Sequence, residues 1–212
     1  MENYEDLLIE ILKKIAQESK QTDLSIPVGI SNRHIHLSRE DVDCLFGKNY
    51  ELTKLKDLSQ PGQYACKETV MVCGPKGMIE NVRILGPERN QTQVEVLKSD
   101  CFKLGIKAPL RLSGELQDSG SVTLIGPKSS KMIASGVIVA KRHIHMPSKD
   151  ATTFDVIDGE NVSIAFGGDR GGILNEVIVR VDDHAGLECH IDVEEANALG
   201  VSSNTNIVIQ KN

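Results

Sequence analysis

The chain has 212 residues, a formal net charge of −6 and 3% aromatic residues. This balance provides no basic field for nucleic acid or anionic lipid, and no run approaches the roughly 20 apolar residues of a membrane-spanning helix. The acidic N-terminus lacks the positive and apolar regions of a secretory signal. We therefore expect a cytoplasmic protein without nucleic-acid or membrane partners, whose length suits one domain or two small ones.

Residues 1–24 are predicted to form an amphipathic helix followed by a linker. Apolar side chains recur from Tyr4 to Ala16 with the spacing of one helix face, and polar residues lie opposite. The polar run from Gln17 to Asp23 separates this stretch from the first strand. Such a helix packs on its own domain or on a partner subunit, or it serves as a targeting or docking peptide.

One tetrapeptide, Arg-His-Ile-His, occurs at 33–36 and again at 142–145, a separation of 109 positions from His36 to His145. The two copies hold four of the six histidines, and each follows a run with strand character. In an extended chain the two histidines of a copy project from the same face, while the isoleucine points into the core. Two imidazoles on one face can bind one metal ion. Pairs of hydrogen-bonded histidines at strand ends are the alternative.

The remaining elements are predicted to be short. Ser38 is a suitable N-cap for a helix, with a carboxylate three residues later and Gly47 as a stop, and the stretch from Met146 to Gly159 repeats this outline. Strand-like runs bounded by turn residues occupy 64–73, 82–85, 93–97, 110–112 and 122–125. Many short strands with few helices indicate small β-barrels. We expect a mainly β fold of two similar barrel domains related by internal duplication, residues 25–130 and 131–212, with exchange of strands between them left open.

A second internal match supplies further candidate ligands. The pairs Leu104-Gly105 and Leu199-Gly200 each follow a short stretch with helical character, and superposing them at an offset of 95 places Glu95 opposite His190. Each half then offers two histidines and a third ligand-type residue, and three protein ligands with open positions are typical of catalytic zinc. Co²⁺, Mn²⁺ and Fe²⁺ suit this donor set less well. The candidate ligands are His34, His36, Glu95, His143, His145 and His190.

Several arginines indicate an anionic substrate. Arg89 lies six residues before Glu95 and is a candidate for bidentate capture of phosphate, or it is a solvated loop residue. Arg33 and Arg142 flank the histidines and could bind an anion or order the metal ligands. The loop 167–172 contains Arg170 among four glycines and reads as a weak phosphate cradle or a mobile hairpin. The five cysteines show no CxxC spacing, so we expect buried free thiols, and no serine nucleophile motif is present.

The combination of these motifs resembles the PduL-type phosphotransacylases, a family of phosphate propanoyltransferases. The resemblance covers roughly residues 25–210 and is carried by the stretches 28–37, 83–89, 93–95, 141–145 and 190–197. It implies two β-barrels capped by short helices, two Zn²⁺ per chain held by the six candidate ligands, and reversible transfer of a short acyl group between coenzyme A and inorganic phosphate. It also implies that Arg89 binds phosphate and that the coenzyme A site is lined by Ser31, Lys56, Arg83, Leu85 and Asn197.

The resemblance extends to partners. Family members are often homodimers, and those of bacterial microcompartments, such as the ones of propanediol degradation, carry an N-terminal encapsulation peptide that contacts shell or cargo proteins. Residues 1–20 could be such a peptide. Two other functions use the same ligands: a dinuclear zinc hydrolase of thioesters or phosphoesters, and a non-catalytic metal-binding protein associated with a microcompartment.

Overall fold

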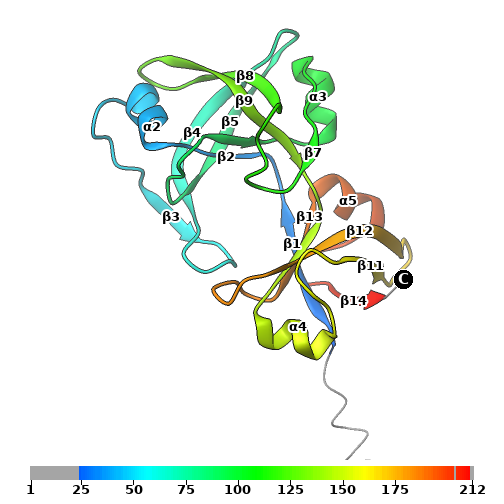
Figure 1. Ribbon diagram of the computed structural model, residues 1–212. Coiled ribbons are helices and arrows are strands. Elements are labelled where there is room, and N and C mark those ends of the chain that lie inside the picture. Colours follow the sequence, from blue (N-terminus) through cyan, green and yellow to red (C-terminus); the bar gives the residue numbers. More distant parts are fainter. Residues whose placement is uncertain (1–23, 203, 211–212) are drawn as a thin grey trace, which may run out of the picture.

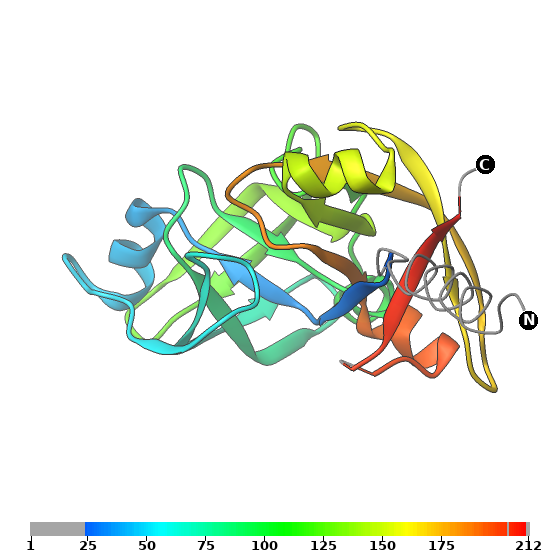
Figure 2. The same cartoon turned by 90° about the horizontal axis from the view of Figure 1, so that it is seen from below.

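The computed structural model describes residues 24–202 and 204–210, and it contains two six-stranded β-barrels. This confirms the mainly β fold with two barrels. The amphipathic helix predicted for residues 1–20 lies outside the described residues. Figures 1 and 2 show the two barrels side by side, with the chain crossing between them more than once. No helix among the described residues is long and apolar enough to span a membrane.

The first barrel closes in the order β4-β5-β2-β6-β9-β8, with β8 returning to pair with β4. Its interior is filled by aliphatic side chains such as Ile35, Ile84 and Leu124, which are fully buried. Two short strands, β3 (Lys54–Asp57) and β7 (Leu110–Arg111), extend it. The barrel strands are β2 (His34–His36), β4 (Tyr64–Cys73), β5 (Met78–Gly86), β6 (Gln93–Glu95), β8 (Gly120–Ile125) and β9 (Ser130–Ala140).

The second barrel closes in the order β1-β13-β10-β12-β11-β14. Its core holds Ile144, Met146 and Ile164, all fully buried. Its strands are β1 (Ile26–Ser31), β10 (His143–Met146), β11 (Asn161–Phe166), β12 (Gly172–Val181), β13 (Glu188–Asp192) and β14 (Asn206–Gln210).

The barrels exchange strands relative to the order of the chain. Strand β1 pairs with β13 and β14, so the N-terminal strand lies in the barrel built mainly from the C-terminal half. Strand β9 pairs with β6 and β8 and belongs to the other barrel, although most of it lies beyond residue 130. In Figure 1 the blue ribbon of β1 and β2 runs from one barrel into the other. The two barrels are therefore joined at the strands that carry both tetrapeptides.

The duplication is visible in the strand pairing around each tetrapeptide. Strand β2 pairs parallel with β5 and antiparallel with β6, and β10 pairs parallel with β12 and antiparallel with β13. The register places His34 opposite Glu95 and His143 opposite His190. Directly opposite residues of paired strands project from the same face. Glu95 and His190, which are 95 positions apart in the sequence, therefore occupy the same position in the two barrels.

Within the described part of the chain, four short helices cap the barrels. The helix α2 (Arg39–Phe46) begins at Ser38, whose side chain accepts a hydrogen bond from the backbone N–H of Asp41, and it ends at Gly47 as predicted. Helices α3 (Lys98–Leu104) and α5 (Val193–Leu199) both end at a glycine with positive φ. The helix α4 (Ser148–Phe154) stops before the expected Gly159, because Asp155 already adopts the left-handed conformation. The strand expected to reach 97 ends at Glu95, since Leu97 is the N-cap of α3.

Candidate metal centre between the two barrels

A cavity of about 570 Å³ is lined by residues of both barrels. Both triplets of candidate ligands contribute to its wall, together with Arg89 and Arg180. Within each triplet the ligand-type atoms lie within 4.8 Å of one another. The structure thus brings together the six residues that the sequence singled out, on two strands of each barrel.

The first triplet comprises His34, His36 and Glu95. The Nδ1 atom of His34 lies 2.8 Å from the carbonyl oxygen of Asn32, which can only accept, so Nδ1 carries the proton and Nε2 is left with its lone pair. That Nε2 lies 3.4 Å from Oε2 of Glu95. His36 is buried, and its Nδ1 has no hydrogen-bond partner among the described residues. Nη2 of Arg89 can only donate, so Nε2 of His36 carries the lone pair, and this is the nitrogen that an ion beside Glu95 would use.

Burial and neighbouring charges shift the pKa values of this triplet, and not all in the same direction. Burial lowers the pKa of His36 to about 3, assisted by the neighbouring His34 and Arg89, so this imidazole is neutral at neutral pH. Burial would raise the pKa of Glu95, but His34, His36 and Arg89 hold it well below its usual range. For His34, burial is outweighed by Glu95 and the net effect raises its pKa. The carboxylate is therefore ionised and able to bind a cation.

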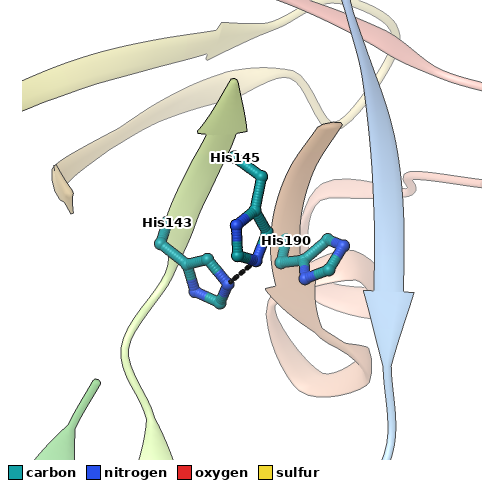
Figure 3. A group of neighbouring side chains, drawn as sticks. All are labelled: His143, His145 and His190. Carbon is teal, nitrogen blue, oxygen red and sulfur yellow. Dashed lines mark hydrogen bonds between the residues drawn. The ribbon is translucent and has the colours of Figure 1, made fainter. Parts of the chain in front are cut away.

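The second triplet comprises His143, His145 and His190 (Figure 3). The Nδ1 atom of His143 donates to the carbonyl of Lys141 at 2.8 Å, which repeats the contact of His34. Its Nε2 lone pair faces Nε2 of His145 at 3.1 Å, and the ring centroids of the triplet are 4.7 to 5.1 Å apart. Burial lowers the pKa of His143 to about 4 and that of His145 to about 3. Three imidazoles converging in this way, two of them with lowered pKa values, fit Zn²⁺.

Arg89 is held beside the first triplet. Its backbone N–H donates to the carbonyl of Leu37, and its Nη1 atom donates to Oγ of Ser113 at 2.8 Å. Its Nη2 atom lies 2.9 Å from Nε2 of His36. Burial lowers the pKa of Arg89, the charge of Glu95 opposes this shift, and the charge of Arg180 adds to it. A fixed guanidinium at the cavity wall is suited to bind an anion.

The similarity to known proteins covers most of the chain. Residues 27–202 match the family described as phosphate propanoyltransferase. The chain belongs to this phosphate propanoyltransferase family. A protein of that name from Rhodobacter capsulatus is 48% identical over 208 residues, which cover 97% of this chain and 95% of the relative. The proteins of that name from Thermotoga maritima and Clostridioides difficile are 53% and 50% identical over 174 and 201 residues, covering 82% and 95% of this chain and 83% and 96% of the relatives.

Membership in the phosphate propanoyltransferase family confirms the resemblance found in the sequence and supports phosphate acyltransferase activity. Residues expected to line its coenzyme A site fall into two groups. Ser31, Arg83 and Leu85 contribute to the cavity wall. Lys56 on β3 and Asn197 on α5 are exposed and do not belong to the described lining. Arg83 donates to the carbonyls of two residues of β4, at 3.0 and 2.6 Å, so part of its hydrogen-bonding capacity is used within the barrel.

The arginines of the two tetrapeptides have a structural role in this family member. The Nε atom of Arg33 lies 2.7 Å from Oδ2 of Asp100, and Nε of Arg142 lies 2.7 Å from Oε1 of Glu195. Each acid is the third residue of its helix, α3 or α5, and its side chain accepts the N-cap backbone N–H. Each arginine therefore ties the histidine strand to a capping helix, which favours the ordering role over anion binding. Arg170 does not belong to the described cavity lining.

The sequence reasoning did not single out several polar residues at or beside the site, among them Gln93, Ser113, Arg180 and Glu188. Gln93 and Glu188 each lie two residues before a candidate ligand, on the same strand, so the alternation of a strand could have indicated both. Strand alternation could not have indicated Ser113 or Arg180. Ser113 lies in the loop after β7 and Arg180 lies on β12, and neither segment carries a candidate ligand. Arg180 stands opposite His145 in the register of β10 and β12, and a parallel pairing between distant segments is not visible in a single sequence.

The cysteines provide no nucleophile in this cavity. All five are free thiols, and Cys66, Cys101 and Cys189 are buried, as expected, whereas Cys44 and Cys73 are partly exposed. Cys189 neighbours His190 but points to the opposite side of β13, into the barrel core. Burial raises its pKa to about 12, which leaves the thiol protonated and unreactive.

Proposed function

We propose that the chain transfers a short acyl group, acetyl or propanoyl, reversibly between coenzyme A and inorganic phosphate at a dinuclear zinc site. The observation that carries this proposal is one cavity whose wall holds two triplets of ligand-type side chains and the guanidinium of Arg89. Family membership supports acyl transfer, and the chemistry of the two donor sets supports zinc.

Two Zn²⁺ ions would each have three protein ligands, one from His34, His36 and Glu95 and the other from the three-histidine triplet. Open coordination positions would remain for substrate. Bound zinc supplies Lewis-acid polarisation of a carbonyl and a soft site for a thiolate. The protonation states of these side chains suit metal binding, because three imidazoles are neutral at neutral pH and the carboxylate of Glu95 is ionised.

Arg89 would hold the phosphate through two parallel charge-assisted hydrogen bonds. An oxygen of that phosphate then attacks the acyl carbon of the thioester, a C–O bond forms and the C–S bond breaks. Coenzyme A leaves as the thiolate, and the acyl group leaves on phosphate. We propose direct transfer without an acyl-enzyme, because none of the cavity residues is an activated serine or cysteine.

The coenzyme A site is proposed to include Ser31, Lys56, Arg83, Leu85 and Asn197. Three of these share the cavity with the metal ligands. The assignment of Lys56 and Asn197 rests on the resemblance, because their exposed positions lie outside the described lining. A homodimer, and association with microcompartment shell or cargo proteins through residues 1–20, are proposed on the same basis.

The test is a thioester assay with acetyl phosphate and coenzyme A, followed by ultraviolet absorbance with and without a chelator. Formation of thioester that stops on chelation supports transfer at a metal site. Release of phosphate in the absence of coenzyme A would indicate the zinc hydrolase instead, and absence of both reactions would indicate a binding protein. Repeating the assay with propanoyl phosphate measures the acyl preference.

A further inference from the structure

Each barrel places one further polar side chain next to its third candidate ligand. Gln93 lies two residues before Glu95 on β6, and Glu188 lies two residues before His190 on β13, so each shares a face with its ligand. The register also agrees, because Gln93 stands opposite His36 and Glu188 opposite His145. The two side chains therefore occupy the same position in the duplicated fold.

Their chemistry is complementary to the ligand that each one contacts. The amide Nε2 of Gln93 donates to Oε1 of Glu95 at 2.5 Å. Oε2 of Glu188 lies 2.5 Å from Nε2 of His190 and accepts a hydrogen bond from it. A carboxylate ligand thus has an amide donor beside it, and an imidazole ligand has a carboxylate acceptor. The third ligand is a carboxylate in one barrel and an imidazole in the other, and its neighbour changes accordingly from a hydrogen-bond donor to an acceptor.

A loop holds each neighbour in place. Gln93 is buried, donates to Oγ of Ser113 at 2.8 Å and accepts the N–H of Gly114 at 2.8 Å. Glu188 accepts from Oγ of Ser59 at 2.6 Å and from Nε2 of Gln60 at 3.1 Å. Both orientations are therefore fixed from outside the strand.

The loop around Glu188 comes from the other barrel. Gln60 follows β3, is buried, and exchanges two hydrogen bonds of 3.2 Å with the backbone of Gly186. Gly29 of β1 stands opposite His190 and leaves the necessary space, since a Cβ atom there would lie 2.8 Å from Cδ of Glu188 and 2.8 Å from Cδ2 of His190. The packing thus fits this pair of side chains.

The contact with Glu188 also selects the ring nitrogen of His190 that an ion would use. His143 has its Nδ1 committed to a carbonyl and offers Nε2. His190 has its Nε2 committed to Glu188, so Nδ1 is left. Figure 3 shows one nitrogen of His190 on the side of His143 and His145 and the other turned away. A carboxylate on the far nitrogen of a metal-binding imidazole fixes its tautomer and increases its basicity.

We infer that Glu188 and Gln93 are positioning residues, each of which orients the third metal ligand of its own barrel by a hydrogen bond of matched polarity. The inference rests on the proposed zinc site and adds to it the groups that hold His190 and Glu95. Both act through a ligand and not on the substrate. Removal of either side chain should therefore weaken the binding of one zinc ion, the one held by its own barrel.

The experiment measures Zn²⁺ affinity of the metal-free protein by competition with a chromophoric chelator. In a His36→Ala background, which retains the three-histidine site, Glu188→Ala is expected to lower the affinity by about 10- to 100-fold. Glu188→Gln should stay within a few-fold of the background, because its amide oxygen still accepts the Nε2 proton. In a His145→Ala background the roles reverse, and Gln93→Ala should weaken the remaining site by a similar factor while Glu188→Ala does not.

Three controls separate positioning from folding. Glu80→Ala removes an exposed carboxylate of β5 and should leave both affinities unchanged. Ser59→Ala and Gln60→Ala remove contacts that orient Glu188 but keep its contact with His190, so each should lower the Zn²⁺ affinity less than Glu188→Ala does. If Glu188→Ala does not fold, the comparison of Glu188→Gln with Glu188→Asp, which draws the carboxylate back from the ring, replaces it.

The outcomes distinguish the two proposals. A wild-type chain that binds no Zn²⁺ overturns the zinc site and this inference with it. If the Glu188→Ala and Gln93→Ala variants still bind two Zn²⁺ ions with wild-type affinity, the inference is overturned while the zinc site stands. Equal losses in Glu188→Ala and Glu188→Gln would make Glu188 a direct ligand and also overturn its positioning role.

Discussion

The Nη2 atom of Arg89 lies 2.9 Å from Nε2 of His36. A guanidinium has donors only, so Nε2 of this neutral imidazole is the acceptor. An ion that took the same lone pair would displace Nη2, and Arg89 would then present that edge to the cavity while Ser113 still held its Nη1 atom. In the proposed site, occupation by metal would therefore be coupled through His36 to the availability of Arg89 for an anion.

The first prediction isolates Arg89. Arg89→Ala should leave two Zn²⁺ per chain and nearly unchanged affinity for coenzyme A, while acyl transfer falls about 10²- to 10³-fold, the scale of a lost donor to developing charge. Arg89→Lys should restore little, because an ammonium cannot form the planar fork. Steady-state kinetics with phosphate and coenzyme A varied separately, together with elemental analysis, measure this. Wild-type turnover in Arg89→Ala would eliminate it as the phosphate ligand, and loss of zinc would assign it a structural role around Glu95.

The second prediction concerns the metals. Purified protein should contain about two Zn per chain, since two separate ligand triplets are present. His36→Ala and His145→Ala should each lose one ion and most activity, because a site with two protein ligands holds Zn²⁺ poorly. Elemental analysis and the thioester assay on the same samples check both points. A fully active protein with one ion or none would refute the dinuclear site.

The third prediction concerns Arg180, which lines the cavity and stands opposite His145. Its side chain has no hydrogen-bond or ion-pair partner among residues 24–202 and 204–210. Its charge acts on Arg89, so an anion between the two guanidinium groups would relieve their repulsion. Arg180→Ala should raise the KM for phosphate about 10- to 100-fold, the scale of one or two charge-assisted hydrogen bonds, and leave zinc content unchanged. Arg39→Ala is the matched control, because Arg39 is exposed and paired with Asp43 and Glu88 away from the cavity. Equal KM values in both variants would exclude a contact with phosphate.

The fourth prediction tests the N-terminal segment. Deletion of residues 1–20 should leave both barrels folded and active, because the strands that close them begin at Ile26. Solubility or assembly should change, since an apolar helix face associates with other surfaces. Circular dichroism, thermal unfolding and light scattering on the truncated and full chains measure these effects. A truncated chain that no longer folds would show that the segment belongs to a barrel core and would remove support for an encapsulation peptide.

The sequence alone determined the face on which each pair of histidines lies. Strand alternation is a local property with a period of two, so the burial of Ile35 and Ile144 and the common direction of His34 and His36 follow from neighbouring residues. The duplication added Glu95 and His190, because repeated landmarks mark the same position in two copies of one fold. These inferences required no knowledge of which strands pair.

The tertiary structure decided everything that depends on strand register between distant segments. Arg180 meets His145 only through the parallel pairing of β10 and β12, and Gln60 reaches Glu188 across 128 positions and from the other barrel. The exchange of β1 is of the same kind, because Val28 pairs with Cys189 in a register that neither stretch specifies alone. Long-range pairing is selected by the packing of the whole core, and a single sequence encodes that packing only in the sum of many weak preferences.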